Sequence, residues 1–277
     1  MQLSYSRRVA AGGVLTALTF AGVGALNATP AYAVATAEVS AIHGMPGTPV
    51  DVYLNGEKTL DNFAPGEVAG PLSLAAGVYD IALTKPGDPV ADAFLTVADA
   101  EVLGGTNISM AAHLDASGQP KLTSFVNDTS KVDAGKSRLI ARHIAAAPAM
   151  DVRAGGTSVF TNLTNSNEAK ADMEAGTIQA DAVLAGTDTV TIGPADLELT
   201  EGTATILYAF GSADAGTLEV VAQTITGLHS TPAGVPSGDG GLAGTKANTW
   251  LYLLAGAGAL LLVGGRARIV TARRNNR

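Results

Sequence analysis

The 277-residue chain contains no cysteine, which excludes disulfides, thiol catalysis and thiolate metal sites. All 25 acidic residues, but only 10 of the 17 basic residues, lie between residues 34 and 249. Such an acidic region repels nucleic-acid phosphates and anionic lipids, so the charge argues against nucleic-acid binding and suits a hydrated module outside the cytoplasm.

The N-terminal segment has the three parts of an export signal. Arg7 and Arg8 form a positive start, Val9–Leu26 is uncharged and apolar, and Ala31-Tyr32-Ala33 is a small-x-small cleavage site. We predict a signal peptide over residues 1–33. One alternative is a retained membrane helix, which the glycines in the apolar run disfavour. Another is twin-arginine export, but the hydrophobic residues that usually follow the arginine pair are missing.

The next region contains a diverged repeat with a period of about 100 residues. Val39–His43 recurs as Leu139–His143, and Asp51-Val52 recurs as Asp151-Val152. We predict a first domain over residues 34–130 and a second over residues 131–228. Further equivalent positions are Gly56 and Gly156, Asn62 and Asn162, Ala76-Gly77 and Ala175-Gly176, and Gly105-Thr106 and Gly202-Thr203.

Each copy has the alternation and turn spacing of short strands. Val50–Leu54 alternates and ends in Asn55-Gly56, a strong turn signal. Turn signals recur at roughly ten-residue intervals, which is typical of a sandwich. The fold class that we predict is all-β: two tandem immunoglobulin-like antiparallel β-sandwiches. The other expected strands are Val39–His43, Gly77–Thr84, Ala93–Val97, Thr106–Leu114, Lys121–Val126, Arg138–Ile144, Thr177–Leu184, Thr189–Ile192, Thr203–Phe210 and Thr217–Thr226, while Asn165–Glu174 is compatible with a short helix.

Beyond the repeats the composition changes twice. Residues 229–249 are rich in Gly, Pro, Ser and Thr, which predicts a flexible stalk. Residues 250–270 begin with the apolar run Trp250–Val263, which predicts one C-terminal transmembrane helix. The arginines that follow this run would keep the basic tail, residues 271–277, in the cytoplasm and the repeats outside.

A possible wall-sorting signal precedes the apolar run. Leu242-Ala243-Gly244-Thr245, followed by apolar residues and arginines, resembles the Leu-Ala-x-Thr-Gly signal read by some actinobacterial sortases. The resemblance implies cleavage after Thr245 and attachment to the cell wall. However, Lys246 stands where that signal has glycine. Simple membrane anchoring is therefore the preferred prediction, and wall attachment stays open.

The repeated histidines and aspartates are the first candidates for a functional site. His43 and His143 each stand eight residues before an aspartate, Asp51 or Asp151, and such a pair can serve as a metal or acid–base site. The alternative is structural, with the imidazole bonded to loop backbone and the carboxylate organising a turn. No third ligand recurs in both copies, whereas a zinc site needs at least three protein ligands, so we favour the structural alternative.

Other candidate residues lack the partners that chemistry requires. His113 and His229 have no counterpart in the other copy, and Ser137 and Ser158 have no recognisable base. Acidic residues cluster in expected loops without the spacing of a calcium loop, so we expect a solvated surface. Those residues are Asp88, Asp92, Asp99, Glu101, Asp196, Glu198 and Glu201. Three Asn-x-Ser/Thr triplets start at Asn107, Asn127 and Asn162, and we expect them to be chance matches in a bacterial protein.

The opening strand, the histidine, the proline, the Asp-Val pair and the Asn-Gly turn resemble the bacterial envelope family catalogued as domain of unknown function 4397. The resemblance extends over about residues 37–228 and implies two tandem copies. Members of that family tend to carry signal peptides and repeated β-rich modules. What the resemblance implies is therefore a location and a fold, because the family has no assigned catalytic residues.

Together these features predict a non-catalytic β-sandwich protein of a bacterial, specifically actinobacterial, envelope. It would present loops for adhesion, envelope organisation or ligand binding, with partners in the membrane, the wall polymer or another surface protein. We expect no catalytic residues, no cofactor and no metal. The alternatives are an envelope hydrolase and a carbohydrate-binding module. The second is disfavoured because residues 34–249 contain no tryptophan and Tyr53, Tyr79 and Tyr208 are expected in the core.

Overall fold

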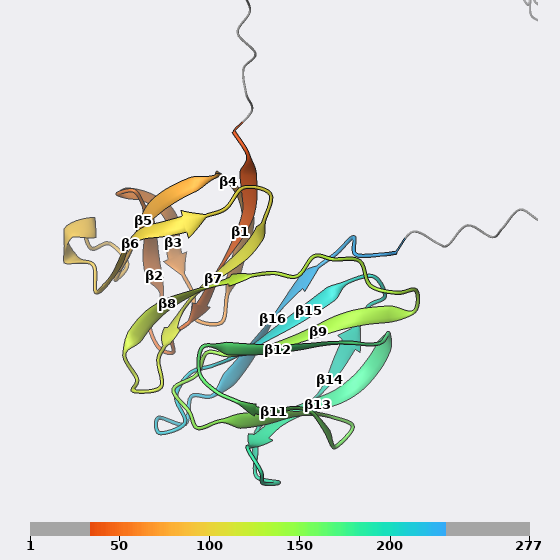
Figure 1. The fold of residues 1–277 in the computed structure, drawn as a ribbon. Helices are drawn as coiled ribbons and strands as arrows, with labels where there is room; N and C mark the ends of the chain where they lie inside the picture. Colours follow the sequence, from red (N-terminus) through yellow and green to blue (C-terminus); the bar gives the residue numbers. More distant parts are fainter. Residues whose placement is uncertain (1–33, 231–277) are drawn as a thin grey trace, which may run out of the picture.

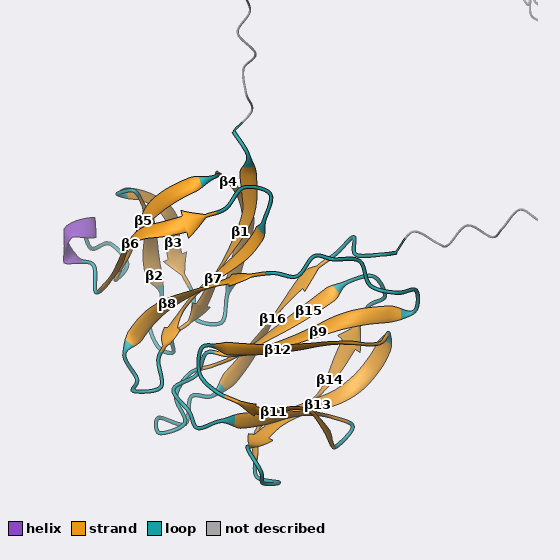
Figure 2. Cartoon of the chain, viewed as in Figure 1, coloured by secondary structure: helices purple, strands orange, loops and turns teal. Residues whose placement is uncertain are grey.

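The computed structural model describes residues 34–230. The predicted signal peptide (1–33), most of the stalk, the anchor (250–270) and the tail (271–277) lie outside the described residues. Within residues 34–230 the regular secondary structure consists of strands, apart from one short 3-10 helix over Val90–Asp92 (Figure 2). None of the helical structure in this range has the length and apolar character needed to cross a membrane.

The first half forms two four-stranded sheets (Figure 1). The strand orders are β4-β1-β7-β8 and β3-β2-β5-β6. The strands are β1 (Thr36–Gly44), β2 (Val50–Leu54), β3 (Glu57–Phe63), β4 (Val68–Ala75), β5 (Gly77–Thr84), β6 (Leu95–Val102), β7 (Asn107–Leu114) and β8 (Pro120–Val126).

The second half repeats this arrangement strand for strand. Its sheets have the orders β12-β9-β15-β16 and β11-β10-β13-β14, so β9 takes the place of β1 and each later strand follows in turn. The strands are β9 (Lys136–His143), β10 (Met150–Ala154), β11 (Thr157–Leu163), β12 (Asn167–Glu174), β13 (Gly176–Leu184), β14 (Val190–Leu199), β15 (Ala204–Phe210) and β16 (Glu219–Ile225).

Each sandwich contains one parallel strand pair, so the prediction of purely antiparallel sandwiches is wrong at that point. β1 runs parallel to β7, and β9 runs parallel to β15. All other paired strands are antiparallel. The parallel partners are separated by most of a repeat, so no local turn signal marks their pairing.

The alternative prediction of a short helix over Asn165–Glu174 is also wrong, because residues 167–174 form strand β12. This strand pairs antiparallel with β9 from Asn167 opposite His143 to Glu174 opposite Lys136. Its side chains alternate, and Ala169, Ala171 and Met173 pack inward. Sequence patterns also missed β3, β4, β10 and β11. β3, β4, β11 and β12 are edge strands with many exposed polar residues, whereas β10 lies inside its sheet and is only five residues long.

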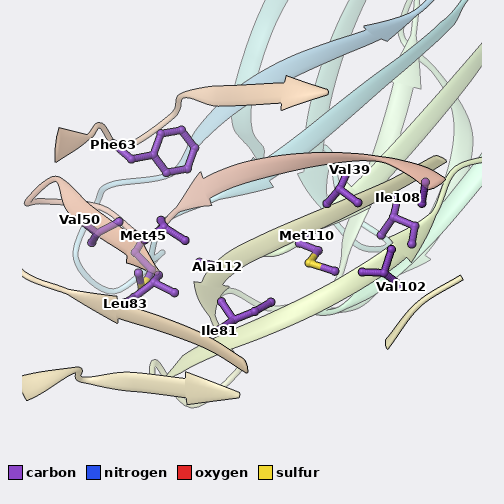
Figure 3. Packing of buried hydrophobic residues seen from close by; sticks show 12 residues of the cluster. Val39, Met45, Val50, Phe63, Ile81, Leu83, Val102, Ile108, Met110 and Ala112 are labelled. Atoms are coloured by element: carbon purple, nitrogen blue, oxygen red, sulfur yellow. The ribbon is translucent and has the colours of Figure 1, made fainter. Parts of the chain in front are cut away.

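The first sandwich has its own apolar core between its two sheets. Figure 3 shows side chains from β1, β2, β5 and β7 meeting there, among them Val39, Val50, Ile81 and Met110. A smaller core joins the two sheets of the second sandwich and contains Leu139, Phe160 and Leu199. Each pair of sheets is therefore held by burial of its inward faces.

A third core lies between the two sandwiches. The sheet containing β1 and β7 turns its other face to the sheet containing β9 and β15 (Figure 1). Consequently β7 and β9 are buried on both faces. The two predicted domains therefore share a core and are not packed independently of each other. Its buried members are Ile42, Ala111, Phe125, Val132, Ile140, Ile144, Ala204, Ile206, Tyr208, Phe210 and Leu228.

The linker between the repeats closes this third core. Val132 is buried there and forms a parallel bridge with His229. The backbone N–H of Val132 donates to the carbonyl of Leu228, and the N–H of Ser230 donates to Val132. The second sandwich therefore extends to Ser230, and His229 belongs to it instead of to the predicted stalk.

Close approach of the two sandwiches requires glycine at position 44. A Cβ on Gly44 would lie 2.7 Å from Cδ1 of the buried Ile144 and 3.3 Å from Cβ of Phe210. We therefore expect Gly44→Val to lower the free energy of unfolding by about 1–3 kcal/mol, because the added atoms force the sheets apart. Gly77→Val is the matched control, since a Cβ there meets no atom within 4 Å. Equal losses in urea unfolding of the two variants would contradict this account.

Candidate functional site

The repeated histidines are both buried and bonded to loop backbone. Nε2 of His43 lies 3.3 Å from the carbonyl oxygen of Thr48, and the N–H of Met45 donates to Nδ1 over 3.3 Å. In His143 the corresponding distances are 3.0 Å to the carbonyl of Pro148 and 3.3 Å from the N–H of Ala145. Because Nδ1 accepts, Nε2 carries the proton, and each imidazole holds its loop closed in the same tautomer.

The repeated aspartates bind backbone N–H groups in the same way. Oδ1 of Asp51 accepts from the N–H of Asn62 over 2.9 Å, and Oδ2 accepts from Gly87 over 3.0 Å and from Lys58 Nζ over 2.6 Å. Burial by itself would raise the pKa of Asp51, but these hydrogen bonds lower it to about 2.

Asp151 repeats the two backbone contacts without the lysine. It accepts from the N–H of Asn162 over 2.7 Å and from Gly186 over 3.0 Å, and these bonds lower its pKa. Position 158 carries Ser158 where the first repeat has Lys58, and Ser158 is exposed. Within residues 34–230 no hydrogen bond or ion pair joins either histidine to its aspartate. The structural interpretation of these four residues is therefore the one that the geometry supports.

The buried histidines make the fold sensitive to acid. Burial disfavours the imidazolium ion and lowers the pKa of His43, His113 and His143 below the ordinary value of 6.5. In the unfolded chain the same groups take up protons near that value, so acidification favours unfolding. We expect the free energy of unfolding to fall as the pH drops below about 6.5, with a further loss below about pH 4 from the two low-pKa aspartates.

Urea unfolding at pH 7.5 and pH 5.5 measures this effect. The variant His113→Asn should reduce the difference between the two pH values, because it removes one of the buried imidazoles. A midpoint independent of pH over this range would show that the three imidazoles do not resist protonation in the folded protein.

His113 and Ser137 are buried and bonded to structural partners. Nδ1 of His113 donates to the carbonyl of Leu114 over 2.9 Å, and Nε2 accepts from the hydroxyl of Thr123 over 2.8 Å. The hydroxyl of Ser137 donates to the carbonyl of Thr203 over 3.1 Å. Neither side chain is therefore placed to attack or deprotonate a ligand.

The acidic residues singled out from the sequence do not converge. Among residues 34–230 no group of three or more histidine and carboxylate side chains is placed to hold a metal ion. Glu201 accepts the N–H of Gly135 over 2.8 Å, which ties two loops of the second sandwich. Asp92, Asp99, Asp196 and Glu198 are exposed.

The three Asn-x-Ser/Thr asparagines have different positions. Asn162 adopts a positive φ of 52°, as does its counterpart Asn62, and asparagine tolerates this conformation better than most residues. Asn107 lies in β7, where its Oδ1 accepts from Nδ2 of Asn127 over 2.6 Å. Asn127 is buried between the sandwiches, and this role had no signal in the sequence.

Asn127 belongs to a buried polar network centred on Arg142. Only 1% of Arg142 is exposed, and its Nη2 donates to Oδ1 of Asn127 over 2.8 Å. Its Nη1 donates to the hydroxyl of Tyr208 over 2.7 Å, and its Nε donates to Oε2 of Glu168 over 2.8 Å. The guanidinium carbon also lies 4.3 Å from the ring centroid of Phe125. Arg142 therefore joins side chains of both sandwiches.

Two further residues complete the network. The hydroxyl of Tyr208 donates to Oε1 of Gln223 over 2.6 Å, and the hydroxyl of Ser109 donates to the same oxygen over 2.8 Å. No buried side-chain nitrogen or oxygen of the described residues lacks a hydrogen-bond partner. A fully satisfied network between two apolar faces specifies one arrangement of the faces, so its role is to orient the sandwiches.

An apolar cavity of about 290 Å³ lies between the two sheets of the second sandwich. Its walls come from β9, β10, β13, β14, β15 and β16, and it reaches the side where β14 and β16 form the sheet edges. The cavity between the sheets of the first sandwich measures only about 50 Å³; its walls include Ile81 and Leu83, but it extends toward β3 and β4 instead of β6. Alanines recur in the wall of the larger cavity: Ala141, Ala180, Ala182, Ala195, Ala209 and Ala222.

The strand registers explain why the two cavities differ in size. Asp51 pairs with Thr84, and the equivalent Asp151 pairs with Val183, so Leu83 corresponds to Ala182. By the same alignment Ile81 corresponds to Ala180. Ile81 and Leu83 are buried in the core of the first sandwich, where they fill the space that the alanines leave open.

One comparison with known proteins bears on this fold. Residues 37–153 match the model of a family described as a domain of unknown function, DUF4397. The matched range contains the whole first sandwich, the linker and strands β9 and β10. No curated protein matches the chain. Over residues 37–153, the chain is therefore similar to the DUF4397 family of unknown function.

Proposed function

We propose that this protein is a non-catalytic module of a bacterial, specifically actinobacterial, cell envelope, anchored at the surface and presenting its sandwiches to a partner or ligand. The main support for the proposal is that the side chains with potential catalytic chemistry form hydrogen bonds to the protein's own backbone. His43, His143, Asp51 and Asp151 all bond loop backbone, and Ser137 bonds Thr203. Such groups hold the fold and are not free to act on a substrate.

The sequence at both ends supports the surface location. Residues 1–33 have the pattern of an export signal, and residues 250–277 have an apolar run followed by arginines. The acidic region between them suits a hydrated environment. The shared core makes residues 34–230 a rigid unit, which a stalk would hold away from the membrane.

Cell fractionation followed by mass spectrometry of the mature chain tests the location. A chain that starts at Val34 and retains Arg277 in the membrane fraction is the expected result. External protease should digest residues 34–249 in intact cells. A chain that ends at Thr245 in the wall fraction would replace the membrane anchor by wall attachment. A chain that retains Met1 in the cytoplasm would contradict the proposal.

An activity assay separates the module from an envelope hydrolase. The full chain and the double variant His43→Asn, His143→Asn are incubated with purified wall polymer, and released fragments are measured. The proposal expects no release above a protein-free control with either chain. Release by the native chain that disappears in the variant would instead favour a hydrolase acting through these imidazoles.

A carbohydrate-binding module needs exposed aromatic rings on which a sugar can stack. Tyr53 and Tyr208 are buried, at 8% and 0% exposure, and Tyr79 is partly buried and donates its hydroxyl to the carbonyl of Ala75. The exposed Phe94 stands in the loop before β6. The described residues thus offer no pair of exposed aromatic rings for a sugar to stack on, which argues against a carbohydrate-binding module.

A further inference from the structure

The cavity in the second sandwich has the size and chemistry of a small-molecule site. We propose that it binds a neutral apolar molecule with a chain-like body, such as a medium-length alkyl or acyl group. An engineered apolar cavity of ~150 Å³ accepts benzene, so about 290 Å³ suits a ligand of roughly ten to twelve non-hydrogen atoms. This inference goes beyond the proposed function and does not depend on where the protein is located.

The contrast between the repeats argues that the space is built into this sandwich. In the first sandwich Ile81 and Leu83 reach into the core and leave about 50 Å³. At the equivalent positions the second sandwich has Ala180 and Ala182, which both line the larger cavity. Replacing two large side chains by alanine in the same part of a core weakens the packing unless something else fills the space. An apolar ligand would restore the contacts that isoleucine and leucine make in the first repeat.

The cavity can be reached from solvent between two edge strands. Ala195 of β14 and Val220 and Ala222 of β16 line it and are themselves exposed. Val220 is 46% exposed, which is unusual for a strand valine that faces a cavity. These edges are the outermost strands of their sheets, so a narrow molecule can enter between them without unpairing any strand.

The charges at the cavity favour a ligand without a negative head group. Asp181 lines the cavity, but Arg153 neutralises it over 2.6 Å and also pairs with Asp188 over 3.2 Å. Arg142 also lines the cavity, but its guanidinium pairs with Glu168 over 2.8 Å. Asp196 lines the cavity as well, is exposed, and takes part in no ion pair within the described residues. The surroundings therefore carry a net negative charge, which repels a carboxylate and accepts an alcohol or an ester.

Photolabelling of the full chain tests the site. The probe is a ten-carbon alcohol with a diazirine on its chain, and the labelled positions are mapped by peptide mass spectrometry. We expect label in residues 180–197 and 220–222, at least tenfold above the equivalent peptides of the first sandwich, 81–100 and 122–124. The corresponding ten-carbon carboxylic acid should label the same peptides at least fivefold less.

Two variants connect the label to the cavity. Ala180→Ile with Ala182→Leu copies the first sandwich, and we expect its label to fall at least tenfold. Ala222→Phe blocks the entrance from an exposed position and should reduce the label even if the double variant fails to fold. The matched control, Ala215→Leu, changes an exposed alanine of the second sandwich that does not line the cavity and should keep the label.

Three results would overturn the proposal. The first is native labelling of residues 180–197 no stronger than that of residues 81–100. The second is undiminished labelling in a folded double variant or in Ala222→Phe. The third is labelling that appears only in a chain ending at residue 249, because the protein's own apolar segment after that residue would then be the natural occupant.

Discussion

Arg142→Ala is expected to lower the free energy of unfolding by about 3–5 kcal/mol, which is large for one substitution. The side chain has 0% exposure and donates hydrogen bonds to Glu168, Tyr208 and Asn127. Removing it leaves the carboxylate of Glu168 without its partner and empties the space above the ring of Phe125. Both sandwiches lose contacts, because Asn127 and Phe125 belong to the first and Glu168 and Tyr208 to the second.

Lys170→Ala is the matched control for this prediction. Lys170 lies on the neighbouring strand β12 and pairs with Asp128 over 2.6 Å, but 48% of its side chain is exposed. Exposed pairs contribute about 0.2–1 kcal/mol, so the loss should be several times smaller than for Arg142. Urea unfolding followed by circular dichroism compares the two variants. Similar losses would show that the buried network does not hold the sandwiches together.

Phe210→Ala is expected to have the second largest effect, about 3–5 kcal/mol. Phe210 belongs to the second sandwich and is 2% exposed, yet its neighbours include residues of the first. A Cβ on Gly66 would lie 3.2 Å from Cζ of Phe210, and a Cβ on Gly44 would lie 3.3 Å from its Cβ. The substitution therefore opens a space at the centre of the shared core, which neither sandwich can close alone.

Phe94→Ala provides the comparison at an exposed site. Phe94 is 44% exposed and lies in the loop before β6, so its removal should change the free energy of unfolding by less than about 1 kcal/mol. Thermal unfolding of the two variants is the measurement. If Phe210→Ala lowered the midpoint no more than Phe94→Ala, the contact between the sandwiches would not contribute to stability.

Much of each sandwich could be predicted from local pattern. The expected strands Val50–Leu54 and Gly77–Thr84 have the bounds found in the structure, because alternation and turn dipeptides mark both of their ends. The equivalent spacing of His43 and His143 also predicted equivalent contacts. Those contacts are local, within five residues along the chain, so the sequence contains all of their partners.

The pairing of distant strands could not be predicted in the same way. β1 pairs in parallel with β7, which lies far away in the chain. The strand conformation of Asn167–Glu174 likewise depends on pairing with the distant strand β9. In β12 the inward residues alternate with polar ones, but two of them are alanine, a small residue that also favours helices, so the strand signal is weak. Pattern alone therefore left a short helix open over Asn165–Glu174, where pairing with β9 imposes strand β12.

The shared core and the cavity were also invisible in the sequence. Arg142 reads as a surface charge, since arginine is almost never fully buried unless it is paired, and its partners are up to 66 residues away. Ala180 and Ala182 read as ordinary small residues of a strand. Only the strand registers show that they stand where the first repeat has Ile81 and Leu83.

The central structural claim is that the two sandwiches form one unit through a shared core. Differential scanning calorimetry of residues 34–230, compared with the variant Phe210→Ala, tests it most directly. We predict one transition for the native segment, with equal calorimetric and van 't Hoff enthalpies, and a lower midpoint in the variant. Two separate transitions in the native segment, with only one of them shifted by the variant, would show two independent domains and contradict the account.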